Sequence, residues 1–122
     1  MGLKSFVYLD FKVKLVDPQV LLDFAAMNFF AAKTMGFKDL KKEYEIWIDF
    51  NLPEDRKERD LKHEVIEFSL MKYNKLAYWQ AHKIATACEN YDHDWVASFY
   101  NERKCLKDQP DPLCFTGPTY QF

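Results

Sequence analysis

The chain has 122 residues, of which 48% are hydrophobic and 17% aromatic, and its net charge is −2. This length is typical of a single domain, and the apolar content excludes a chain that is disordered throughout. Basic and acidic side chains are interspersed, so no basic face is concentrated enough to predict binding to nucleic acid. We predict one domain over residues 1–107 and an extended C-terminal tail over residues 108–122.

The N-terminus lacks the apolar run and small-residue cleavage site of a secretory signal. The three cysteines are an odd and sparse set, unlike the even, dense frameworks of small secreted domains. We therefore expect reduced thiols and a cytoplasmic location. A disulfide between Cys105 and Cys114 is the alternative.

The first part of the chain predicts a strand followed by a long helix. Apolar and polar side chains alternate over residues 6–16, which is typical of a strand with one buried face. Asp17 and Pro18 then supply a helix cap and a first-turn proline, and Gly36 stands where a left-handed C-terminal residue is expected. The helix predicted over residues 18–35 is apolar nearly all round. This pattern favours a helix buried in the domain or in an oligomer interface over a membrane span.

A second strand is expected over residues 44–50, where apolar and polar side chains alternate again. The two strands are expected to be neighbours in a small sheet. If they pair directly, a right-handed parallel crossover is the favoured connection.

Three helices are expected after the second strand. The first covers residues 60–72 and begins either there or already near Glu54, after a proline. Asn74 is expected to turn the chain in the left-handed conformation, and the next helix covers residues 77–89. The last helix covers residues 94–104. Together the elements predict an α+β domain with a small β-sheet, a buried apolar helix, a helical hairpin and a C-terminal helix that leads into the tail.

Two of the three histidines lie in the predicted hairpin. His63 and Glu67 are one turn apart on the same helix face, and a hairpin centred near Asn74 sets His82 within reach of Glu67. Imidazole and carboxylate groups are zinc ligands, and a catalytic zinc ion takes about three protein ligands and leaves one position open for water. Glu64 projects about 100° round the helix from His63, where it could take a proton from that water.

Residues 46–67 carry a resemblance to a known family. Their sequence is Ile-Trp-Ile-Asp-Phe-Asn-Leu-Pro-Glu-Asp-Arg-Lys-Glu-Arg-Asp-Leu-Lys-His-Glu-Val-Ile-Glu. It resembles the core of small zincin-like metallopeptidases of the ImmA/IrrE type, in which a strand and a Leu-Pro-Glu-x-x-Arg loop lead into a His-Glu-x-x-His helix. Residues 78–85, Tyr-Trp-Gln-Ala-His-Lys-Ile-Ala, are also similar to the second helix of small phage-encoded proteins that carry a His-Glu-x-x-Glu helix.

The resemblance covers roughly residues 44–89. It implies that His63 is a metal ligand, that Glu64 is a general base, that Glu67 takes the position of the second ligand and that His82 is a third ligand. The chain departs from the zincin motif at Glu67, where the motif has histidine.

Two interpretations of this cluster stay open. His63, Glu67 and His82 either hold a zinc ion, with hydrolysis as a further step that uses Glu64, or form a metal-free polar cluster that fixes the hairpin. The leading prediction is a small zincin-like metal-site protein, which the resemblance suggests is phage-encoded and which would then act in the host cytoplasm or the virion.

The alternative prediction is a protein that is not an enzyme and that binds another protein, such as a phage virion component or a host-directed inhibitor. It rests on the apolar helix expected over residues 18–35 and on the tail, whose apolar residues are Leu113, Phe115, Tyr120 and Phe122. A protein partner or a homo-oligomer is expected in that case. Neither prediction involves a membrane.

Overall fold

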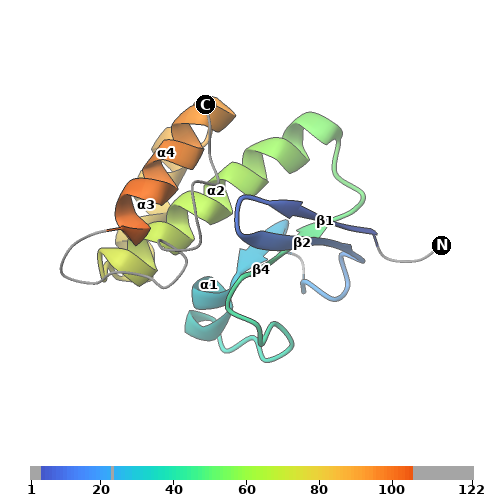
Figure 1. The fold of residues 1–122 in the computed structure, drawn as a ribbon. Coiled ribbons are helices and arrows are strands. Elements are labelled where there is room, and N and C mark those ends of the chain that lie inside the picture. Colours follow the sequence, from blue (N-terminus) through green and yellow to red (C-terminus); the bar gives the residue numbers. More distant parts are fainter. Residues whose placement is uncertain (1–3, 23, 106–122) are drawn as a thin grey trace.

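The fold is α+β, as predicted, in a computed structural model that describes residues 4–22 and 24–105. Four strands form one mixed sheet in the order β1-β2-β4-β3, and the long helix α2 packs along it (Figure 1). Helices α3 and α4 pack in turn on α2. The predicted tail over residues 108–122 lies outside the described residues.

The strand predicted over residues 6–16 is a hairpin, so this prediction was wrong. Strands β1 (Lys4–Tyr8) and β2 (Phe11–Val16) pair antiparallel around a two-residue turn, in which Leu9 has a φ of 54°. The Asp10 carboxylate in this turn accepts hydrogen bonds from Tyr100 and Lys104 of the last helix. The alternation of side chains continues through the turn without a glycine or asparagine, which is why the sequence gives no sign of it.

The prediction of one long helix over residues 18–35 was also wrong. Asp17 does start a turn there, but the turn ends at Leu22, whose φ is 52°. The chain then forms the short strand β3 (Ala26–Asn28), which pairs antiparallel with β4, and the short helix α1 (Phe29–Thr34). An apolar run does not distinguish a buried strand from a buried helix, because neither shows a polar face.

Strand β4 (Glu45–Asp49) confirms the second predicted strand and pairs parallel with β2, as expected. The earlier of the two predicted starts holds for the next helix, since α2 covers Glu54–Tyr73. The predicted turn conformation was wrong, because Asn74 is right-handed and Lys75 takes the left-handed conformation with a φ of 58°. Helices α3 (Tyr78–Cys88) and α4 (His93–Lys104) confirm the last two predicted helices.

The buried central helix of the domain is α2. Every residue from 61 to 70 is buried, because this part of α2 contacts β3 and β4 on one side and α3 and α4 on others. Ala81 and Ala85 of α3 are fully buried, so their small side chains allow α3 to approach α2 closely. The consequence is that polar residues in the middle of α2 are enclosed by protein.

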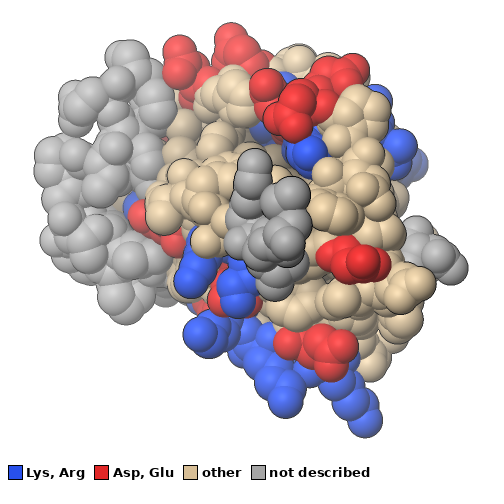
Figure 2. Space-filling view, turned by 90° about the vertical axis from the view of Figure 1, so that its right-hand side faces the viewer, with Lys and Arg blue, Asp and Glu red and all other residues tan. Residues whose placement is uncertain are grey.

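Charged side chains are not evenly distributed on the surface. On the face shown in Figure 2, lysine and arginine gather at the lower end, and acidic side chains are more numerous at the upper end. The loop between α1 and β4 contributes exposed lysines at positions 38, 41 and 42. Within the described residues, no helix is both long and apolar enough to cross a membrane.

The two described cysteines differ in state. Cys88 is free and half-buried, whereas Cys105 is disulfide-bonded. The expectation of reduced thiols therefore fails for Cys105. Cys114 lies outside the described residues.

Candidate metal centre

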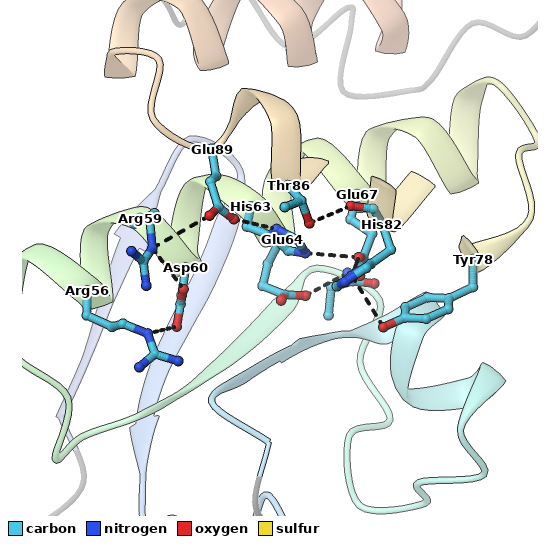
Figure 3. A network of polar contacts seen from close by, with 11 residues as sticks. Arg56, Arg59, Asp60, His63, Glu64, Glu67, Tyr78, His82, Thr86 and Glu89 are labelled. Atoms are coloured by element: carbon cyan, nitrogen blue, oxygen red, sulfur yellow. Dashed lines mark hydrogen bonds and ion pairs between the residues drawn. The ribbon is translucent and has the colours of Figure 1, made fainter. Parts of the chain in front are cut away.

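The predicted site residues come together where α2 faces α3 (Figure 3). His63, Glu64 and Glu67 lie on two successive turns of α2, and the hairpin places His82 of α3 against them. The His63 and His82 rings lie edge to face with their centroids 4.9 Å apart. This arrangement is the one that the hairpin prediction required.

Glu67 is the centre of the cluster. Its Oε2 atom is 3.1 Å from Nε2 of His63 and 3.0 Å from Nδ1 of His82. The Glu67 side chain is almost fully buried, while that of His82 is 44% exposed. One carboxylate oxygen therefore joins two imidazoles at the boundary between the core and solvent.

Glu89 is a third carboxylate at the site, beside Glu64 and Glu67, and it was not among the predicted site residues. Its Oε1 atom is 2.9 Å from Nδ1 of His63, so His63 lies between two carboxylates. The signal in the sequence was its spacing, because Glu89 follows His82 by seven residues, or about two helical turns, and so shares its face. A carboxylate on the outer nitrogen of an imidazole fixes the ring and is typical of metal-binding histidines.

Asn28 is fully buried and is the second site residue that was not predicted from the sequence. Its Oδ1 atom accepts a hydrogen bond from the backbone N–H of Ala31 and so caps α1. This fixes the orientation of the amide, and Nδ2 donates to Oε1 of Glu64 at 2.8 Å and to Oε1 of Glu67 at 2.9 Å. The short helix α1 thereby positions both carboxylates.

The buried charges shift two pKa values. Burial and the charge of Glu67 raise the pKa of Glu64 to about 8, despite the opposing effects of His63 and Asn28. Burial alone would lower the pKa of His63, but its hydrogen bond to Glu67 and the nearby carboxylates outweigh burial and raise the pKa to about 9. In the metal-free protein at neutral pH, His63 and Glu64 are therefore both protonated.

A pocket of about 310 Å³ opens over the cluster. His63, Glu64, Glu67 and His82 all line it. Tyr78 stands at its edge, where its ring stacks on His82 at 5.4 Å between centroids and its hydroxyl lies 3.4 Å from Nδ1 of that residue. The cluster is therefore open to the pocket, chiefly on the side of His82, whereas His63, Glu64 and Glu67 are buried.

The donor set fits a metal ion. One nitrogen or oxygen from each of His63, Glu67 and His82 lies within 4.8 Å of the other two. Donors about 2.0–2.1 Å from a tetrahedral zinc ion are about 3.3–3.4 Å apart. The two separations from Glu67, 3.1 and 3.0 Å, would have to widen by only a few tenths of an ångström. A His/Glu/His group with one open side can thus hold a divalent ion.

The third histidine and the tryptophans do not form a comparable site. Asp92 caps α4 by accepting a hydrogen bond from the backbone N–H of Trp95. His93 bonds Tyr8 through Nδ1 and Glu58 through Nε2, so it links three elements. The tryptophans are dispersed, since each contacts a different aromatic neighbour.

Comparisons with protein families, curated proteins and solved structures gave no match to this chain. The geometry of the site therefore carries the functional argument.

Proposed function

We propose that the protein is a zincin-like metalloprotein that binds one zinc ion through His63, Glu67 and His82 and uses it for hydrolysis. The observation that carries this proposal is the position of Oε2 of Glu67, within 3.1 Å of one imidazole nitrogen from each of two helices. Glu67 thereby takes the place of the second histidine in the zincin motif. The pocket above the cluster supports a site that a substrate can enter.

Zinc, when bound, supplies a Lewis acid that acidifies water and polarises a carbonyl or phosphoryl oxygen. The protein's part is to orient the groups around it. Glu89 holds Nδ1 of His63, so Nε2 points into the cluster. Asn28 holds Oε1 of Glu67 and leaves Oε2 for the metal.

Glu64 is the general base in this proposal, because a zinc ion bound beside it favours its ionised form over the protonated form of the metal-free protein. Asn28 donates to Oε1 of Glu64, which leaves Oε2 to take a proton from water and return it to a leaving group. Glu64 is buried but lines the pocket, which places it beside the space where a substrate would lie. Because its role is proton transfer, its loss should abolish hydrolysis without removing the metal.

Metal analysis tests the first part of the proposal. Protein purified without chelator should contain about one zinc per chain, and a His63→Ala/His82→Ala variant should contain almost none. His93→Ala is the matched control, because His93 lies outside the cluster and should leave the zinc content unchanged. Equal and negligible zinc in the wild type and the double variant would contradict metal binding.

Cleavage of labelled casein by zinc-loaded protein tests the second part. The expected result is cleavage by the wild type and none by Glu64→Gln, with equal zinc in both samples. Peptide hydrolysis is contradicted if the loaded wild type does not cleave casein, or if Glu64→Gln cleaves it equally fast.

A second candidate function is a protein-binding role in which the cluster is structural. It is favoured by the complete bonding of the Glu67 carboxylate, whose Oε2 contacts both histidines and whose Oε1 accepts from Asn28. Trp79 on α3 is 76% exposed and would be one contact for a partner. Sedimentation of the full chain and of a chain ending at Asp108 tests it. Identical monomers that capture no protein from lysate would count against this role.

A further inference from the structure

Two arginines line the same pocket as the candidate metal ligands. Arg56 and Arg59 belong to the first two turns of α2, and Arg59 lies one turn before His63 on the same side of the helix (Figure 3). Neither arginine takes part in the proposed metal binding or proton transfer. Their side chains are 45% and 40% exposed, so a ligand in the pocket can reach them.

Each guanidinium group contacts acidic side chains through its Nε atom. Arg56 Nε lies 3.4 Å from Asp60, and Arg59 Nε lies 3.7 Å from both Asp60 and Glu89. These ion pairs are longer than hydrogen bonds, and neither guanidinium donates a hydrogen bond within the described part of the chain. Arg59 Nε and Asp60 Oδ2 are buried atoms that lack a hydrogen-bond partner there.

This geometry leaves strong donors unused at the pocket. Asp60 and Glu89 compensate the charge of the arginines and fix their position, while the forked ends of the guanidinium groups keep their N–H donors. A planar guanidinium binds carboxylates and phosphates through two parallel hydrogen bonds. An oxyanion would therefore satisfy donors that the protein itself does not satisfy.

One stretch of the pocket wall is apolar, beside the polar side chains of Tyr78 and Thr86. Phe24, Ala25 and Met27, which precede or belong to β3, line it together with Ala31 and Met35. The side chain of Phe24 is large and partly exposed. The pocket thus combines two arginines with their acidic partners Asp60 and Glu89, an apolar stretch of wall and the candidate metal ligands within about 310 Å³.

We propose that Arg56 and Arg59 bind the oxyanion of an acidic substrate, a carboxylate or a phosphate, whose reacting group lies at the His63, Glu67 and His82 cluster. This inference rests on the proposed hydrolytic function, because it assigns the substrate class of the same site. The apolar part of the substrate contacts the wall formed by Phe24 and Met27. A substrate without an anionic group would leave the arginine donors unpaired and bind more weakly.

Calorimetric titration with inorganic phosphate and with succinate tests the inference, using full-length protein both chelator-treated and zinc-loaded. The wild type should bind at least one of the probes, and which one it binds distinguishes a phosphate from a carboxylate substrate. Arg56→Gln/Arg59→Gln should weaken that binding about tenfold or more, since each arginine contributes charged hydrogen bonds. Lys75→Gln/Lys83→Gln removes the same charge from exposed positions away from the pocket and should bind like the wild type.

Two results would overturn the inference. One is a wild type that binds neither probe, and the other is equal affinity in the wild type and the arginine double variant. If the double variant does not fold by circular dichroism, Arg56→Gln alone replaces it, because the ion pairs of Arg56 involve only Asp60.

The zinc content of the same samples separates this inference from the proposed function. Zinc without anion binding overturns only the substrate class. Anion binding without zinc overturns only the metal site.

Discussion

Replacing Glu64 by glutamine should stabilise the metal-free protein at neutral pH. The pKa of Glu64 rises from 4.5 to about 8 on folding, chiefly because the side chain is buried. Below pH 4.5 the carboxyl group is neutral in both states and imposes no penalty. Between these two pKa values the folded state binds one proton more than the unfolded state, so the free energy of unfolding falls by about 1.4 kcal/mol per pH unit. The penalty at pH 7 is on the order of 3 kcal/mol, and Glu64→Gln should remove it.

Glutamine keeps the contact that glutamate makes here, because its carbonyl oxygen can still accept from Nδ2 of Asn28. The assay is urea unfolding of chelator-treated wild type and Glu64→Gln between pH 5 and pH 8. Metal must be absent, because a nearby cation would favour the ionised carboxylate. The stability advantage of the variant should be below about 1 kcal/mol at pH 5 and widen steadily to neutral pH.

The control is Glu54→Gln, which lies on the same helix but is exposed to solvent. It should change stability by no more than about 0.5 kcal/mol at every pH. An advantage of Glu64→Gln that does not grow with pH would refute the argument. So would a variant that is less stable than the wild type at pH 8.

Three further substitutions test other contacts. Asn28→Ala removes the cap of α1 and two hydrogen bonds to buried carboxylates. It should therefore lower the free energy of unfolding, measured with urea, by about 2–4 kcal/mol. A decrease below about 1 kcal/mol would contradict the assigned role. Asp10→Ala removes the buried ion pair with Lys104 and should cost about 3–5 kcal/mol, whereas an unchanged unfolding midpoint would show that this contact is not stabilising. Glu89→Gln should weaken zinc binding about 10–100-fold by loosening His63 without removing a ligand, and unaltered affinity in a competition titration would argue against that positioning.

The sequence predicts the second half of the fold better than the first. Helices α2, α3 and α4 have helical spacing of apolar residues over long stretches, together with local start signals such as Asp92. In the first half, the hairpin turn at Leu9 and Asp10 contains no glycine or asparagine, although Leu9 has a positive φ. The residues before α1 are mostly apolar and show no pattern that distinguishes a strand from a helix. Part of this segment is a strand because it pairs with β4. The secondary structure of these segments depends on contacts with residues that are distant in the sequence, and local sequence patterns do not reveal such contacts.

The same distinction applies to the site. His63, Glu67 and His82 could be predicted because two lie on one helix and the third follows across a short hairpin. Asn28 could not, because it reaches the site only through the strand β3 and the cap of α1. Glu89 was within the predicted hairpin, but its role depends on the rotation of α3 against α2.

A crystal structure of protein soaked in zinc, with anomalous scattering measured at the zinc absorption edge, shows whether the cluster binds the metal. One strong anomalous peak is expected between Nε2 of His63, Oε2 of Glu67 and Nδ1 of His82. The same crystals should show no peak of comparable height at His93. A map without a peak at the cluster, in which Glu67 still joins the two histidines by hydrogen bonds, would contradict metal binding.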